Sequence, residues 1–238
     1  MATMTLDELV AQLRAAYGDA LRSVILYGSA AGGEHIPKRS DYNVLVIADS
    51  LPPERLRAAA AVGAAWTEGG SPPPLTLTAS EWRGSSDIFA MEYADILDRH
   101  KVLHGEAPFE GISVARRDLR LQVEREAMGK LLQFRQGVLA AGNDQRKQLA
   151  LLEASLSTMM TIFRAVVRLS GQVPPTDNAG LALAVATQAG FDGAPFARVV
   201  RHVRGSEKIP SAEVDGLIAG YLAGLERLVA YIDRLAVS

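Results

Sequence analysis

The sequence predicts an α/β N-terminal half followed by an all-α helical bundle. Up to about residue 110, short runs rich in β-branched residues alternate with segments of helical spacing. Beyond that point, long helical patterns are separated only by short breaks containing Gly, Pro and Asn. The 238 residues are enough for two small domains, each with its own core. We therefore expect one domain over residues 1–110 and a second over residues 115–238.

In the first half, the strongest local signals are one capping box and two strands. Thr5 followed by Glu8 is the pattern of a capping box and predicts a helix that ends near Gly18. Residues 21–27 and 42–48 are rich in Val, Ile, Leu and Tyr, which favours strands. The remaining expected elements are a helix over 53–66, a strand over 75–78, a capped helix from Thr78, a helix over 87–100 and an edge strand over 101–103.

In the second half, five helical segments with short connections predict a bundle. They are expected over residues 117–141, up to 169, 178–190, 194–203 and 211–236. Leu121, Met128 and Leu132 are among the apolar residues that mark the first of these helices, and Met128 is expected in the core.

Composition excludes several classes of protein. The absence of cysteine rules out disulfides, thiolate metal sites and a cysteine nucleophile, and it fits a cytoplasmic protein. A formal net charge of -2 makes nucleic acid an unlikely partner, because general nucleic-acid-binding surfaces are strongly basic. The polar start has no features of a signal peptide, and no apolar run reaches the roughly 18 residues of a membrane span, so no membrane association is expected.

Two short motifs carry the candidate chemistry. Gly28 and Ser29 come directly after the first predicted strand, where glycine allows close approach of the backbone to a phosphate. A helix starting at Ser29 would direct N–H groups at that phosphate. Asp41 and Asn43 stand two residues apart at the start of the second strand, so their side chains are expected on one face, where such a pair can bind Mg²⁺. Both motifs also have simpler interpretations as turn and sheet residues.

These motifs together resemble the nucleotidyltransferase superfamily that includes DNA polymerase beta and the aminoglycoside nucleotidyltransferases. Tyr27-Gly28-Ser29 is followed by eleven residues and then by Asp41-Tyr42-Asn43 and an apolar strand, and the resemblance covers roughly residues 20–105. It implies an α/β (α+β) nucleotidyltransferase fold with a mixed sheet flanked by helices, followed by a helical domain. It also implies that Mg²⁺ assists transfer of a nucleotidyl group from an NTP to an acceptor.

On this resemblance, the site residues can be assigned roles. Asp41 and Asn43 would be catalytic and hold the metal, while Gly28, Ser29 and Ser40 would bind the nucleotide. Two cations between the motifs, Lys38 and Arg39, could also contact the triphosphate, although loop cations are usually solvated.

The sequence departs from the family pattern at three places. Asn43 stands where the family has a second acid, and the strand over residues 74–78 has no carboxylate to act as general base. The loop after Gly28-Ser29 contains only Ala and Gly over residues 30–33, where the family often has Arg. Carboxylates elsewhere that could replace the base are Glu34, Asp87, Glu92, Glu124 and Glu126.

Three functions are therefore open. The first is a nucleotidyltransferase that uses an NTP and an unknown small-molecule or protein acceptor. The second is a catalytically degenerate relative that binds nucleotide or a partner protein and has a regulatory role. The third is an interaction module, compatible with either of the others, in which the helical bundle forms a homodimer.

Overall fold

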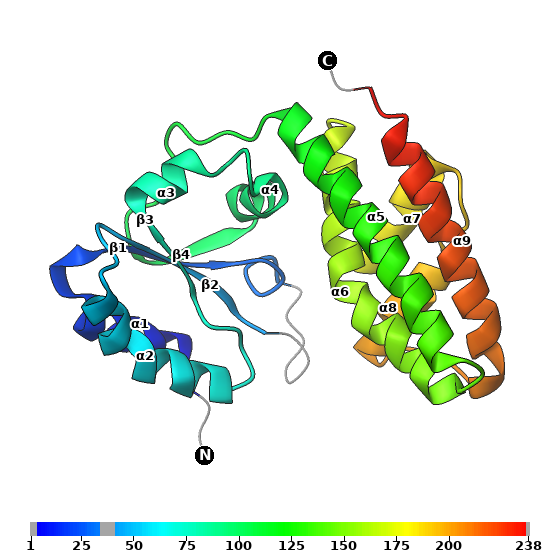
Figure 1. Ribbon diagram of the computed structural model, residues 1–238, viewed down its shortest axis with the longest axis horizontal. Helices are drawn as coiled ribbons and strands as arrows, with labels where there is room; N and C mark the ends of the chain where they lie inside the picture. The colour runs from blue at the N-terminus through cyan, green and yellow to red at the C-terminus, as the bar shows by residue number, and fades with distance from the viewer. Residues whose placement is uncertain (1–3, 34–40, 237–238) are drawn as a thin grey trace. The chain divides into compact units, whose positions relative to one another are not determined.

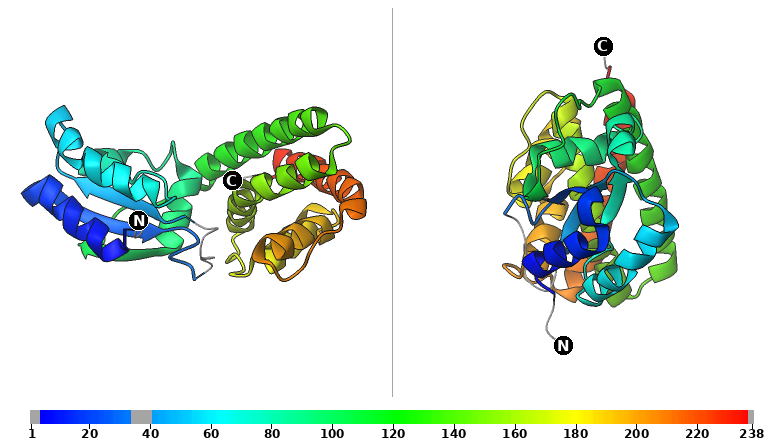
Figure 2. Two further views of the ribbon diagram at one scale, coloured as in Figure 1. Left: turned by 90° about the horizontal axis from the view of Figure 1, so that it is seen from below. Right: turned by 90° about the vertical axis from the view of Figure 1, so that its left-hand side faces the viewer.

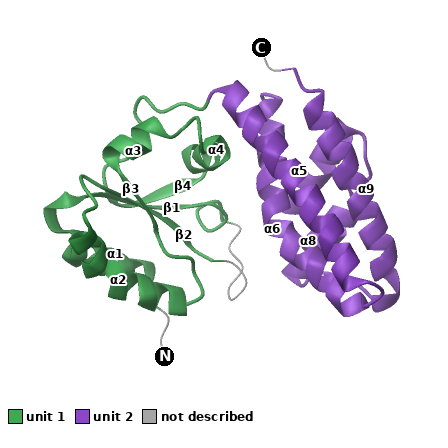
Figure 3. Ribbon diagram, viewed as in Figure 1, with its two compact units in different colours: residues 1–114 green, residues 115–238 purple. Residues whose placement is uncertain are grey.

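The computed structural model describes residues 4–33 and 41–236. Contacts divide the chain into two compact units, residues 1–114 and 115–238, which we call unit 1 and unit 2 (Figure 3). The expectation that residues 1–110 and 115–238 are separate folding domains remains a prediction, since compactness alone does not show that either part folds without the other.

Unit 1 is built on a four-stranded sheet of order β3-β2-β1-β4. Its strands are β1 (Leu21–Tyr27), β2 (Asn43–Ala48), β3 (Leu75–Thr78) and β4 (His100–Gly105). β1 pairs antiparallel with both β2 and β4, whereas β2 and β3 are parallel. The predicted mixed sheet is therefore confirmed.

Helices cover both faces of this sheet (Figure 1). On one face lie α1 (Leu6–Tyr17) and α2 (Pro53–Glu68), and on the other lie α3 (Ala79–Gly84) and α4 (Ala90–Asp98). A short 3-10 turn, η1 (Gly18–Ala20), joins α1 to β1.

The alternation of side chains along β2 divides the core of unit 1 between these two faces. Val44 and Val46 are buried in a cluster with residues of α1 and α2. Leu45 and Ile47 are buried in a second cluster with Trp82 of α3 and residues of α4. Along β2, even-numbered residues therefore face α1 and α2, and odd-numbered residues face α3 and α4.

Two helices of unit 1 begin at the capping boxes. The Thr5 N–H donates to the Glu8 carboxylate at 2.8 Å, and the Glu8 N–H donates to the Thr5 hydroxyl at 3.2 Å. Thr78 and Glu81 make the same pair of hydrogen bonds at 2.7 and 3.2 Å. These reciprocal bonds satisfy N–H groups that the first helical turn leaves without an intrahelical acceptor.

Unit 2 is the predicted all-α bundle. Its helices are α5 (Arg116–Ala141), α6 (Gln145–Leu169), α7 (Asn178–Ala189), α8 (Ala194–Arg204) and α9 (Val214–Asp233), with a 3-10 turn, η2 (Ser211–Glu213), before the last. α5 packs on α6 and α9, and these two helices separate it from α7 and α8 (Figure 2).

α6 is the central helix of the bundle. It is long and apolar enough to cross a membrane by length and composition alone, but 61% of its most apolar 18-residue window is buried. Its buried side chains include Leu152, Met159 and Phe163, and Ser155 donates a hydrogen bond of 2.7 Å to the hydroxyl of Tyr221 on α9. A core helix of a bundle has this composition for packing reasons.

One expectation about α5 is wrong. Met128 is exposed rather than in the core, and so are Leu121 and Leu132. The buried face of α5 is instead formed by other apolar residues of the same helix, which are Leu119, Val123, Ala127, Leu131 and Phe134.

Candidate functional site

β1 ends in a tight turn at Gly28. This residue is buried and has φ +76°, a conformation that glycine adopts without the penalty that a Cβ would cause. The Gly32 N–H donates to the Gly28 carbonyl at 3.0 Å. Residues 28–33 form turns after β1, so no helix starts at Ser29 to direct N–H groups at a phosphate. Gly33, with φ +77°, is incompatible with a continuing right-handed helix.

The start of β2 lies directly beside this turn. Asn43 pairs with Tyr27 across the two strands, and a Cβ at Gly28 would lie 3.4 Å from Asn43 Nδ2. Asp41 is exposed and lies two residues before the start of β2. The structure therefore brings the two sequence motifs to one end of the β1–β2 pair. Lys38, Arg39 and Ser40 lie outside the described residues.

The segment entering β2 is held from the α1–α2 side of the sheet. The Tyr42 N–H donates to the hydroxyl of Ser71 at 3.2 Å, and the rings of Tyr42 and Trp66 lie 6.0 Å apart between centroids. Since side chains alternate along an extended chain, Tyr42 on this side directs Asn43 to the opposite face, where α4 lies.

α4 brings two carboxylates to the same region. Burial raises the pKa of the Tyr27 hydroxyl, and the nearby charges of Glu92 and Asp95 raise it further. Tyr27 and Asn43 are a cross-strand pair, so their side chains share this face of the sheet. Glu92 is exposed, whereas Asp95 is buried.

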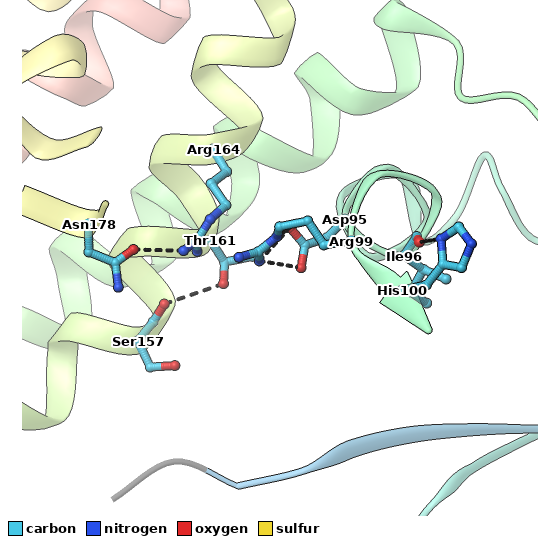
Figure 4. A network of polar contacts seen from close by, with 8 residues as sticks. All are labelled: Asp95, Ile96, Arg99, His100, Ser157, Thr161, Arg164 and Asn178. Carbon is cyan, nitrogen blue, oxygen red and sulfur yellow. Dashed lines mark hydrogen bonds and ion pairs between the residues drawn. The ribbon is translucent and has the colours of Figure 1, made fainter. Parts of the chain in front are cut away.

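An arginine from the end of α4 lies against the Gly28–Gly33 turn. Arg99 forms a bidentate ion pair with Asp95, with Nη2 2.8 and 2.7 Å from the two carboxylate oxygens (Figure 4). A Cβ at Gly32 would lie 3.2 Å from Arg99 Cδ and 3.3 Å from its Nη1. Gly32 therefore leaves the space that the Arg99 side chain occupies.

Arg99 does not stand out as a site residue in the sequence, although the Asp95–Arg99 spacing of four residues is typical of an ion pair on a helix. Its proximity to the glycine-rich turn is a contact between distant parts of the chain, and no local pattern could have indicated it. Arg99 lies beside residues 30–33, which have no cation of their own, and its guanidinium is paired with Asp95.

The third acid of the family pattern has no counterpart on β3. Leu45 pairs with Leu75, so a continuation of the parallel register would place Pro73 level with Asn43. Among the other candidate bases, Asp87 is exposed in the segment before α4, and Glu34 lies outside the described residues. In unit 2, Glu124 forms an ion pair with Arg120 at 3.0 Å, and Glu126 is half-buried on the same helix.

In residues 4–33 and 41–236, no group of three or more His, Asp or Glu side chains is close enough to hold a metal ion. Asp41 and Asn43 offer one carboxylate and one amide oxygen. These two oxygens are too few to hold Mg²⁺ by themselves. They fit a site in which Mg²⁺ also binds substrate phosphates and water, since such sites often use only one or two protein carboxylates.

A cleft of about 690 Å³ lies at the opposite end of the sheet and is not the candidate site. Its lining includes Arg22 and Asp49, which form an ion pair, and Ser23, whose hydroxyl donates to the Glu106 carbonyl at 2.6 Å. These polar groups are satisfied by one another, which is typical of a structural role.

The chain has the nucleotidyltransferase fold. It is similar to the crystal structure of spectinomycin adenyltransferase AAD(9) from Enterococcus faecialis with ATP and spectinomycin, with a TM-score of 0.53 and 13% sequence identity. The similarity covers 92% of this chain and 96% of that one, so it includes the helical unit as well as the sheet. No protein-family model matches the sequence, and no curated protein matches it.

Proposed function

We propose that this protein is a nucleotidyltransferase that transfers a nucleotidyl group from an NTP to a hydroxyl of a small molecule. The observation that carries this proposal is the meeting of the Gly28 turn with Asn43 and Asp41 at one end of the β1–β2 pair. Similarity in fold supports it, although fold alone does not establish an activity.

In the proposed reaction, the acceptor oxygen forms a bond to the α-phosphorus of the NTP. The bond between that phosphorus and the oxygen bridging to the β-phosphate breaks, and pyrophosphate leaves. The hydroxyl proton passes to a base. Glu92 is our first candidate for this base, because its charge reaches Tyr27, the cross-strand neighbour of Asn43.

The other residues have roles that follow from their positions. Gly28 allows the backbone to approach the triphosphate, and Arg99, which Asp95 holds beside Gly32, would contact a phosphate at the same turn. Asp41 and Asn43 would hold Mg²⁺, which when bound neutralises charge on the phosphate oxygens. Lys38, Arg39, Ser29 and Ser40 remain proposed triphosphate contacts.

A nucleotide-transfer assay tests the proposal. The purified chain is incubated with α-labelled ATP or GTP, Mg²⁺, and hydroxyl-bearing small molecules, beginning with spectinomycin, since the similar enzyme was crystallised with it. We expect a labelled acceptor and released pyrophosphate. Asp41→Asn should reduce the rate by a factor on the order of 10²–10³, the usual loss when a key electrostatic contact is removed.

Asp19→Asn is a matched control, because Asp19 is also an exposed carboxylate but lies before the other end of β1. It should leave the rate unchanged. Glu92→Gln should lower the rate by a factor on the order of 10²–10⁴ if Glu92 is the general base. Transfer that is equally fast in wild type and Asp41→Asn would refute the assignment of the site.

A degenerate, nucleotide-binding protein is the second candidate. It is favoured by Asn43 in place of an acid and by the proline-rich segment before β3 at the level where a base would stand. Calorimetry distinguishes the two. Triphosphate binding that does not respond to Mg²⁺, with no turnover for any acceptor, supports the second candidate.

A further inference from the structure

α5 carries a line of exposed apolar side chains along its solvent-facing side. Leu121, Met128, Leu132 and Leu139 are 66%, 44%, 50% and 83% exposed. At about 100° per residue, these four positions fall within roughly 20° of one line parallel to the helix axis. The opposite side of α5 packs on α6 and α9, so this line is not part of the bundle core.

The spacing of these residues is symmetric. The intervals are seven, four and seven residues, centred on position 130. A two-fold axis through that centre would bring an antiparallel copy of α5 into a register in which every apolar residue meets another. Leu121 would face the partner's Leu139, and Met128 would face the partner's Leu132. Such self-complementarity is what an isologous interface requires.

We propose that this protein forms a homodimer through an antiparallel α5–α5 contact between two copies. This inference does not depend on the nucleotidyl-transfer activity. The contact would extend over 19 residues, from Leu121 to Leu139, or about 27 Å of helix. An antiparallel pair also opposes the two helix dipoles favourably.

Charges beside the apolar line are complementary in this register. Glu124 and Arg135 lie on the same side of the line, and the two-fold axis would place Glu124 beside the partner's Arg135, about one residue out of level. Within one chain, Glu124 pairs with Arg120 at 3.0 Å and Arg135 with Glu226 at 2.7 Å. Dimerisation would join these two pairs into a network across the interface.

The contact is small for a permanent dimer, because stable interfaces bury about 800 Å² on each partner and a single helix pair buries less. We therefore expect an equilibrium with a dissociation constant on the order of micromolar. Sedimentation velocity of the full chain over a range of concentrations measures this equilibrium.

Leu132→Glu places a charge beside the two-fold axis and should raise the dissociation constant by about 30-fold or more. Val173→Glu is the matched control, because Val173 is 86% exposed and lies in the connection between α6 and α7. It should leave the equilibrium unchanged. Thermal unfolding of both variants checks that they remain folded.

Cross-linking tests the register. The chain has no cysteine, so introduced thiols are the only ones present. Under a mild oxidant, the double variant Leu121→Cys with Leu139→Cys should form a disulfide-linked dimer. Leu139→Cys alone should not, because the two thiols would lie about 27 Å apart along the helices.

Three results would overturn the proposal. One is a chain that stays monomeric up to about 100 μM, well above the expected dissociation constant. Another is a dimer that Leu132→Glu does not weaken. The third is efficient cross-linking by Leu139→Cys alone, which would indicate a parallel pair. Binding of a monomeric chain to lipid vesicles, with no self-association, would assign the apolar line to a membrane instead.

Discussion

Each end of the β1–β2 pair has a carboxylate and a glycine with positive φ, but the two ends differ in what these residues contact. At the end where β1 begins, Arg22 forms an ion pair with Asp49, and Ser23 donates a hydrogen bond to the Glu106 carbonyl. At the end where β1 terminates, Asp41 is exposed beside the Gly28 turn. At the first end these polar groups pair with one another, whereas at the second end the Asp41 carboxylate is exposed.

A glycine with positive φ stands at each end, and the two glycines show the same difference. Gly105 has φ +77°, and a Cβ there would overlap the carbonyl oxygen of Arg22. Gly28 has φ +76°, but a Cβ there would meet only Asn43 Nδ2, at the limit of ordinary contact. Gly105 is therefore required for packing of the backbone, whereas Gly28 preserves space at the candidate site.

The largest expected effect on stability is that of Gly105→Ala. The new methyl group would overlap backbone rather than a flexible side chain, and the positive φ adds strain. We expect a loss of about 3 kcal/mol or more in the free energy of unfolding, measured by urea denaturation. A loss below about 1 kcal/mol would show that β4 can shift away from β1. That result would contradict tight packing of the Gly105 backbone against the backbone of Arg22.

Gly28→Ala should reduce activity as well as stability. The left-handed conformation costs an alanine about 1–2 kcal/mol, and the methyl group would fill the space at the turn. We expect kcat/KM for the NTP to fall by about 10-fold or more, since about 1.4 kcal/mol of lost transition-state stabilisation has this effect. Unchanged transfer in a folded variant would mean that the turn does not contact the nucleotide.

Asn43→Asp should increase activity at the end of the β1–β2 pair that holds the candidate site. A second carboxylate beside Asp41 would strengthen binding of Mg²⁺, so we expect several-fold faster transfer and a lower Mg²⁺ requirement. The measurement is the transfer rate as a function of Mg²⁺ concentration, with Asn43→Ala as the control for loss of the side chain. The absence of any gain would favour the degenerate, nucleotide-binding candidate.

The smallest effect is expected for Asp49→Asn, at the end where β1 begins. Hydrogen bonds from Arg22 lower the pKa of Asp49 below its ordinary value of 3.8, although both side chains are exposed and screened by water. A lowered pKa in the folded state stabilises the protein above the unfolded pKa. That contribution is lost as the pH falls through the folded value.

The variant should therefore have a slightly lower Tm than wild type at pH 7, by about 1 °C. The difference should disappear at a pH below the folded pKa of Asp49, where the wild-type carboxyl group is also protonated. A Tm difference that grows toward acid pH would have the wrong sign for this ion pair.

Much of the fold could be predicted because its signals are local. The strand over residues 21–27 was predicted with the bounds that β1 has, and both capping boxes form as expected. The expectation that Asp41 and Asn43 share one face also rests on a local rule, the alternation of side chains along a strand, and it stays a prediction. The turns over residues 28–33, in place of a helix starting at Ser29, depend on the positive φ of Gly28 and Gly33, and glycine in a sequence does not reveal its φ.

The candidate site was only half predictable. Gly28 directly follows β1 and Asn43 begins the neighbouring strand β2, so their motifs could be placed together from sequence. Arg99 and Glu92 come from a helix more than forty residues further on, and their approach to β1 depends on how α4 packs on the sheet. No local pattern encodes that approach, because it is the sum of many contacts across the core.

The sequence by itself determined that most of these strands and helices form, because capping, turn formation and β-propensity act over a few neighbouring residues. It also determined that α5 is helical. It could not determine which side of α5 is buried, since both the core line through Val123 and the exposed line through Leu132 are apolar. Tertiary packing on α6 and α9 chose between them, because only one side of a helix can face its bundle.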